Sequence, residues 1–303
     1  MTTRHWKLIQ GFALAALLPL CAACNGEDDG LPQDADKQPV QVNITRATMD
    51  GGGNWTWANG DQVGLSINGA THTLTYSNGS WAPAITGVDF PATVQAWYPA
   101  SASMDKFNIP YNGVESELGA GSGDWIEGTN DQSTSNKLAA IDYMTTETII
   151  SNVSLDLTLR HRMCLVTVNI VSYEGFGSAS PTIADVRIYS YTPIEKEGNE
   201  YDRSDNCKNI DVNPYVETNS NGSKRYKAII APGYYDGLDG SSLPFITMKV
   251  NGTTVSATYS SKLLSGNAYT FNLTVKNPAA TTRSAGTPEC ELELVEVHDM
   301  NEE

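Results

Sequence analysis

"VSLDLTLRHRMCLVTVNIV" (residues 153–171) alternates apolar and polar side chains on both sides of a short basic interruption. Three leucines occupy alternate positions from 155 to 159, so they would lie on one face of an extended strand. The second half, from residue 164 to 171, is rich in the β-branched residues that are typical of strands. This stretch therefore predicts two consecutive β-strands.

The same period of two recurs along most of the chain, between groups of Gly, Asn, Asp and Pro. The further predicted strands are 62–67, 72–77, 93–99, 185–191, 225–232, 245–250, 254–259 and 269–275. Asn-Gly pairs at 78–79, 221–222 and 251–252 are typical of two-residue hairpin turns. No long amphipathic helix is visible, and only a short helical turn is expected within 136–149. The sequence predicts an all-β protein built from antiparallel β-sandwiches.

Strand segments extend over about 260 residues, more than one small sandwich needs. We therefore expect two tandem sandwiches, an N-terminal one at 40–150 and a C-terminal one at 151–303. The Gly-, Ser- and Asn-rich stretch 112–136 is expected to be a long loop of the first sandwich. Residues 24–39 are polar and acidic with nothing to bury, and they predict a flexible tether.

Residues 1–23 have the pattern of a secretory signal peptide, with a basic start and an apolar run that is short for a membrane span. Ala22 and Ala23 precede Cys24, and this junction resembles the lipobox of bacterial lipoproteins. The resemblance implies that Cys24 is acylated and anchors the protein to a membrane. An ordinary signal peptide cut near Ala23 is the alternative. The acids at 27–29 resemble a signal for export to the outer face of the outer membrane, or else they only solvate the tether.

The formal net charge is −16, with 19 Lys and Arg against 35 Asp and Glu. Such a chain has no basic field that would attract a phosphate backbone, so nucleic acids and other anionic partners are disfavoured.

No motif for catalysis, a metal or a cofactor is present. His72, His161 and His298 are far apart and lack ligand spacing, and no G-x-S-x-G occurs. We expect His161 to be a hydrogen-bonded structural residue, and we expect no enzymatic activity. Carboxylates are numerous, and a glycosidase needs only two of them facing each other across a cleft.

The tryptophans and cysteines are assigned structural roles. Trp57, Trp81 and Trp97 are expected to anchor the core, with a sugar-stacking surface as the alternative.

Three cysteines follow Cys24. Cys164 lies in an apolar run, so a disulfide, if one forms, is expected between Cys207 and Cys290. The three cysteines after Cys24 are odd in number and show no C-x-x-C spacing, so they do not suggest a zinc site or a redox motif.

Seven short elements follow one another in an order that resembles the fimbrillin-like proteins, the Mfa-like or type V pilin group. They are "ITRAT" (44–48), "WANGDQVGL" (57–65), "YSNGSWAPA" (76–84), "VQAWYP" (94–99), "LTLRHRMCLVTVNI" (157–170), "AIIAP" (228–232) and "LLSGNAYTFNLTV" (263–275). The resemblance implies a pair of transthyretin-like (Ig-like) sandwiches, exported as an outer-membrane lipoprotein of the cell surface. It implies a fimbrial subunit or adhesin whose partners are other pilin subunits. The competing interpretations are an anchored carbohydrate-binding lipoprotein and, third, an enzyme acting on glycans.

The same resemblance implies maturation by a trypsin-like protease that cuts after a basic residue near the start of the first domain. Arg46, followed by Ala47, matches that position, with Lys37 as the nearest rival. Residues 40–46 would then be a removable edge strand.

The predicted C-terminal strand, 290–299, changes the parity of its apolar residues near 294, which predicts a β-bulge. This strand either completes its own domain or is donated to the next subunit.

Overall fold

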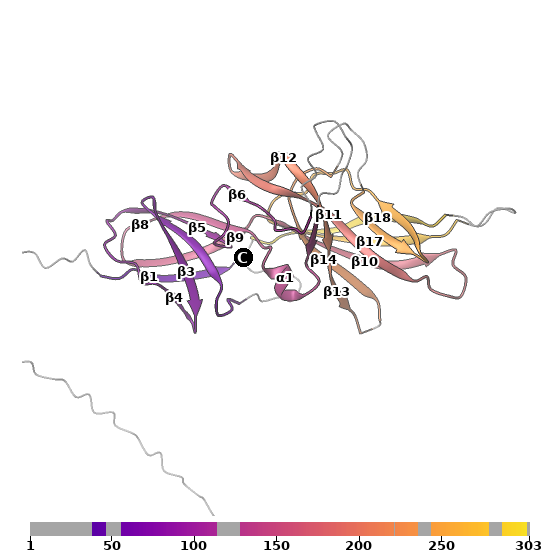
Figure 1. Cartoon of the computed structure of the whole chain (residues 1–303), viewed down its shortest axis with the longest axis horizontal. Coiled ribbons are helices and arrows are strands. Elements are labelled where there is room, and N and C mark those ends of the chain that lie inside the picture. Colours follow the sequence, from indigo (N-terminus) through magenta and orange to yellow (C-terminus); the bar gives the residue numbers. More distant parts are fainter. Residues whose placement is uncertain are drawn as a thin grey trace, which may run out of the picture. The chain divides into compact units, whose positions relative to one another are not determined.

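The computed structural model describes residues 38–46, 56–113, 128–220, 222–235, 244–278 and 287–301. Strands dominate these residues, and the one helix among them is the short α1 (Ser135–Ala139). Thr134 caps this helix, because its side chain accepts a hydrogen bond from the Lys137 amide at 3.3 Å. The all-β prediction is confirmed, and the helical turn lies where it was expected (Figure 1).

The first sheet has seven strands in the order β1-β9-β8-β5-β2-β3-β4. Their bounds are β1 (Gln41–Arg46), β2 (Gln62–Ile67), β3 (Ala70–Ser77), β4 (Ser80–Ala82), β5 (Ala92–Tyr98), β8 (Met144–Ile150) and β9 (Ser154–His161). Buried and exposed residues alternate strictly along β9, and its three leucines all lie in the core. This is the pattern that the opening stretch predicts.

The other two sheets follow the orders β13-β14-β10-β17-β18 and β16-β15-β11-β12-β7, and β6 pairs with β11. Their bounds are β6 (Lys106–Phe107), β7 (Gly128–Asp131), β10 (Cys164–Glu174), β11 (Ile183–Glu197), β12 (Glu200–Asn213), β13 (Tyr215–Thr218), β14 (Lys224–Ile230), β15 (Ile246–Val250), β16 (Thr253–Ala257), β17 (Asn267–Lys276) and β18 (Glu289–Asp299). The two strands predicted within 153–171, the eight further predicted ranges and the predicted C-terminal strand all coincide with observed ones.

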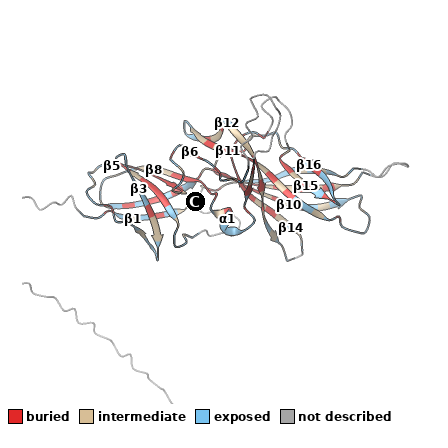
Figure 2. Ribbon diagram, in the orientation of Figure 1, coloured by how far each residue is buried: buried red, intermediate tan, exposed pale blue. Residues whose placement is uncertain are grey.

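Buried apolar residues form two hydrophobic cores. Figure 2 marks the buried residues along the strands. The smaller core draws on the first sheet, and the larger core draws on the other two sheets. Residues 104–143 contribute to the larger core, residues 144–159 to the smaller one, and residues from 163 onwards to the larger one again. The division into two sandwiches at residue 150 stays a prediction, because core membership does not decide which segments fold independently.

The stretch 112–136 was expected to belong to the first sandwich, and its described part contradicts this. Strand β7 pairs with β12 in the sheet that covers the larger core. The side chain of Gln132 is fully buried there and bonds both backbone groups of Ile229, at 2.7 and 2.8 Å. A buried amide needs such partners, which only the folded chain brings to it.

Two hairpin turns confirm the Asn-Gly predictions. Asn78 and Gly79 have φ angles of 50° and 88°, and Asn251 and Gly252 have 49° and 85°. Positive φ at both central residues is the type I′ geometry that suits the twist of a tight hairpin. The residue Asn221 of the third pair lies outside the described residues.

The sheets are not wholly antiparallel as predicted. The pairs β1–β9, β10–β17 and β12–β7 are parallel. Each of these pairs joins strands far apart in the sequence, as parallel pairing requires. A local pattern cannot indicate such pairings.

Candidate functional site

Arg46, the predicted processing residue, is the last residue of β1, and β1 lies at the end of the first sheet's strand order. The strand pairs in parallel with β9 from Gln41 to Arg46. It inserts Ile44 into the smaller core, where that side chain is 2% exposed. A strand at this position can be lost without interrupting the rest of the sheet's ladder.

The side chain of Arg46 is enclosed, with 5% of its surface exposed. Its guanidinium carbon lies 3.9 Å from the ring centroid of Trp57 and 4.4 Å from that of Tyr98, as cation–π contacts require. A terminal nitrogen lies 3.5 Å from a carboxylate oxygen of Asp61. We call Trp57, Tyr98 and Asp61 the Arg46 cage.

The cage also holds the backbone of β1. The indole N–H of Trp57 donates a 2.7 Å hydrogen bond to the carbonyl of Ile44. Trp57 is itself fixed by edge-on contacts with Trp81, at a centroid distance of 4.9 Å, and with Tyr98, at 5.4 Å. Burial raises the pKa of Tyr98, although the neighbouring Arg46 opposes this rise. The tyrosine therefore stays neutral at physiological pH.

A trypsin-like protease must take an arginine side chain into its own specificity pocket. Here the Arg46 cage already holds that side chain. The end of β1 therefore has to come away from the cage before a protease can bind Arg46. Ala47, on the other side of the predicted cleavage point, lies outside the described residues. The structure places Arg46 at the end of an edge strand, and both cleavage after it and removal of the strand stay predictions.

The tryptophans were expected in the core. Trp97 is 8% exposed and belongs to the larger core, while Trp57 and Trp81 are partly buried against the smaller one. None of the three is a fully exposed ring, so the core interpretation is favoured over a stacking surface.

The C-terminal strand β18 pairs antiparallel with β17 of its own chain, from Asn267 opposite Asp299 to Lys276 opposite Glu289. The predicted bulge is present. Phe271 lies opposite Leu294 and Thr270 opposite Glu296, so that Val295 is the extra residue.

The residues after β18 anchor the chain end to the same core. Met300 is 1% exposed, and its amide donates to the Gly266 carbonyl at 2.8 Å. The amide of His161 donates to the side-chain oxygen of Asn301 at 2.8 Å. In this structure the strand completes its own domain, which is one of the two roles that the sequence left open.

His161 has the structural role expected of it. Its Nδ1 donates to a carboxylate oxygen of Asp142 at 2.8 Å, and the two side chains are 2% and 1% exposed. The other carboxylate oxygen of Asp142 has no hydrogen-bond partner among the described residues. No cluster of three or more His, Cys, Asp or Glu that could hold a metal occurs in the described part of the chain.

The cysteines Cys164, Cys207 and Cys290 are all free thiols. The expected Cys207–Cys290 disulfide is therefore not formed in this structure, although both residues pack against the larger core. Burial raises the pKa of the Cys290 thiol to about 11, so its reactive thiolate is scarce at neutral pH.

The remaining predicted features lie outside the described residues. These are the signal peptide, the lipidation site Cys24 and the tether up to residue 37. Among the described residues, no helix is long and apolar enough to cross a membrane.

Sequence reasoning missed Asp61, Tyr98, Asp142 and Asn301. Nothing in the local sequence links Asp61 to an arginine fifteen residues earlier. The contacts of Asp142 and Asn301 likewise span 19 and 140 residues. A single sequence carries no signal for pairings of this kind.

Comparison with known structures supports the fold. A cell adhesion protein from Bacteroides ovatus is 13% identical and superimposes with a TM-score of 0.55, covering 87% of this chain and 98% of the other. A fimbrial protein from the same species (20% identity, 78% and 48% covered, TM-score 0.45) and the tip fimbrial protein of Porphyromonas gingivalis (8% identity, 78% and 94% covered, TM-score 0.39) superimpose with lower TM-scores. No protein of curated function matches the chain.

Residues 45–291 of the sequence match the sequence model of one protein family, described as fimbrillin-like. The match begins next to Arg46, and it includes most of both hydrophobic cores and the start of β18. It therefore covers most of the 303 residues, and the chain belongs to the fimbrillin-like family.

Proposed function

We propose that this protein is a non-enzymatic fimbrial subunit or surface adhesin that assembles by strand exchange after cleavage at Arg46–Ala47. The protein is exported as a lipoprotein, held through Cys24 at the outer membrane, and released from that anchor by the cut. The observation that carries the proposal is β1, a short terminal strand that ends at the caged Arg46. Family membership supports the assembly with other pilin subunits.

Loss of β1 would expose a backbone edge and an apolar pocket to which an incoming strand can bind. Leu155, Leu157 and Leu159 of β9 are buried, and β9 would regain a free backbone edge along six register positions. The pocket for Ile44 in the smaller core would also open. A strand from another subunit can add its backbone hydrogen bonds to such an edge and its alternate side chains to such pockets.

The first prediction concerns the N-terminus. Protein shed from cells should begin at Ala47, and the cell-bound form should carry acyl chains on Cys24. N-terminal sequencing and intact-mass measurement of both fractions test this, and electron microscopy of overproducing cells should show fibres. Shed protein that begins elsewhere contradicts the cleavage site. An absence of fibres together with an intact, acylated chain favours the second candidate, an anchored carbohydrate-binding lipoprotein.

A second prediction tests the Arg46 cage as a latch. Replacing Trp57 by leucine removes a cation–π contact and the hydrogen bond to the Ile44 carbonyl. These contributions amount to about 1–3 kcal/mol, so the opened state should be populated, and cut, about tenfold more often. The measurement is the rate at which the Ala47 N-terminus appears in purified protein treated with trypsin.

The matched control for the latch is Asn43→Ala, an exposed residue of the same strand whose bond to Asp156 is at the surface. We expect wild-type cleavage rates from this variant, because exposed contacts contribute little. Equal rates for Trp57→Leu and wild type would mean that the cage does not limit cleavage.

A further inference from the structure

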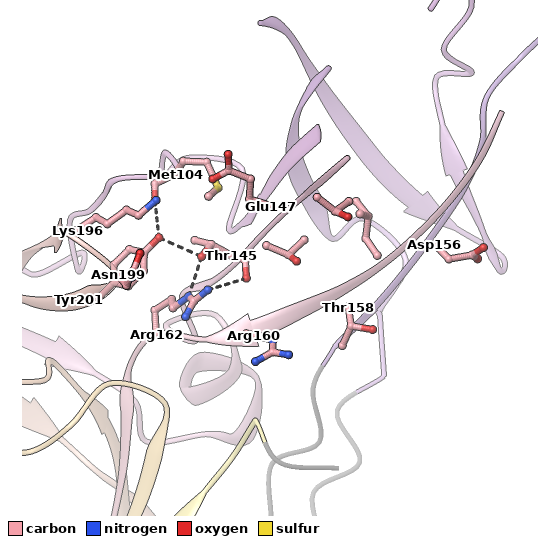
Figure 3. Close-up of a pocket in the computed structure, with 13 residues that line it drawn as sticks. Met104, Thr145, Glu147, Asp156, Thr158, Arg160, Arg162, Lys196, Asn199 and Tyr201 are labelled. Atoms are coloured by element: carbon pink, nitrogen blue, oxygen red, sulfur yellow. Dashed lines mark hydrogen bonds between the residues drawn. The ribbon is translucent and has the colours of Figure 1, made fainter. Parts of the chain in front are cut away.

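A polar pocket of about 500 Å³ lies along the C-terminal half of β9, and no residue of the Arg46 cage lines it. It is lined by β8 and β9 of the first sheet and by the turn between β11 and β12. Strands β8 and β9 pair only at Met144–His161 and Thr145–Arg160, and beyond these positions their facing edges are unpaired with each other. The pocket occupies this opening (Figure 3).

Two guanidinium groups face the pocket from neighbouring positions on one side of the chain. Arg160, Arg162 and Lys196 all line the pocket, and Figure 3 labels the three side chains. Arg160 and Lys196 make no ion pair within the described ranges. Burial lowers the pKa of Arg162, and the nearby charge of Arg160 lowers it further. The two cations repel each other, and an anion between them would relieve that repulsion.

Arg162 is held in place by the protein. Its Nε donates to the Thr145 hydroxyl at 2.7 Å, and its guanidinium carbon lies 5.0 Å from the ring centroid of Tyr201. The Tyr201 hydroxyl is bonded in turn to Thr145, at 3.1 Å, and to the Met104 carbonyl, at 2.7 Å. Thr145 is fully buried. This network fixes one cation of the pocket before any ligand arrives, which lowers the entropic cost of binding.

The composition of the lining selects the kind of anion. Three cations and two carboxylates, Glu147 and Asp156, give the lining a net formal charge of +1. A ligand with a single negative charge matches this, whereas the carboxylates would repel a polyphosphate. The hydroxyls of Thr146, Thr148 and Thr158 and the amide of Asn199 add neutral hydrogen-bonding groups.

We propose that this pocket binds a carboxylated sugar, such as a uronic or sialic acid residue, with its carboxylate between Arg160 and Arg162. Arginine forks match carboxylate geometry, and the hydroxyl, amide and carboxylate groups of the lining match the hydroxyls of a sugar ring. The volume suits a ligand of one or two rings. Although the chain as a whole is strongly anionic, this pocket provides a local site for an anion.

An acidic peptide strand is the competing ligand, and the lining disfavours it. Among the lining residues only Met104, Leu157 and the ring of Tyr201 supply apolar surface, whereas an added strand gains specificity from a row of pockets for alternate side chains. The inference rests on the adhesin part of the proposed function. It does not depend on cleavage or assembly, so its failure would leave those predictions untouched.

Titration calorimetry on the purified chain tests the site with glucuronate, galacturonate and N-acetylneuraminate. Glucose, galactose, inorganic phosphate and a peptide of residues 289–301 are the comparison ligands. At least one acidic sugar should bind saturably and at least tenfold more tightly than any neutral sugar. No binding of any acidic sugar at about 10 mM, equal binding of phosphate, or binding of the peptide alone would overturn the proposal.

Arg160→Gln is the decisive variant, because this side chain is exposed and makes no hydrogen bond or ion pair among the described residues. It should weaken binding of the acidic sugar at least tenfold, since a charge-assisted hydrogen bond is lost. The matched control is Lys224→Gln, an exposed cation on β14 outside the pocket, which should bind within twofold of wild type. Unchanged binding by Arg160→Gln would place the sugar elsewhere and refute the site.

Discussion

A chain that lacks residues 288–303 is expected to lose its native fold, because β18 and the residues after it complete the larger core. Ten register positions pair β18 with β17, and Met300 is 1% exposed in that core. Loss of a buried methionine side chain costs about 2–5 kcal/mol, and each ladder hydrogen bond contributes about 0.5–1.5 kcal/mol. The total, on the order of 5 kcal/mol or more, approaches the whole stability of an ordinary domain.

Near-ultraviolet circular dichroism and thermal unfolding of the shortened chain measure this loss. The matched control removes only residues 302 and 303, which keeps Met300 and Asn301, and it should melt as the full chain does. A shortened chain with native spectra and melting temperature would contradict own-domain completion. That result would favour the other role, in which the strand is dispensable in the monomer and is donated to a neighbour.

Asp142→Ala is expected to destabilise the protein by about 3–5 kcal/mol. The His161–Asp142 pair is almost completely buried, and its two groups are 2.8 Å apart. Removing the carboxylate leaves a buried imidazole N–H without the acceptor that it uses, in surroundings from which water is excluded. Asp142→Asn keeps an acceptor oxygen at the same place, so it should cost less.

Urea unfolding followed by intrinsic fluorescence gives the comparison. Asp89→Ala is the matched control, because that carboxylate is exposed and its loss should change the stability by less than about 0.5 kcal/mol. If Asp142→Ala unfolds at the same urea concentration as the control, the pair does not stabilise the fold. The burial of the His161–Asp142 pair would then have to serve something other than stability.

The strands that were predicted are those whose own side chains alternate. Strand β17 alternates apolar and polar residues from Tyr269 to Val275, and β9 alternates throughout. Strand β12 was missed because its sequence, "EYDRSDNCKNIDVN", is polar along most of its length. It becomes a strand through β11, with which it pairs from Ile188–Val212 to Glu197–Glu200. Strand formation depends on such partners more than helix formation does.

The candidate site was predicted only in part. The position of Arg46 at the end of an edge strand followed from the resemblance, and the bulge in β18 followed from the parity of its apolar residues. The Arg46 cage and the pocket beside Arg160 did not, because each gathers residues from separate strands. The overall charge even argued against a site for an anion.

The sequence by itself determined the all-β class, the hairpin turns and the family, because these depend on alternation and on short ordered motifs within single segments. Only the tertiary structure decided that Arg46 is enclosed, that β18 closes its own domain, and that two arginines share one polar pocket. These features depend on contacts between residues tens to hundreds of positions apart. Such contacts form only when the hydrophobic cores fix the strands against one another, and one sequence does not specify them locally.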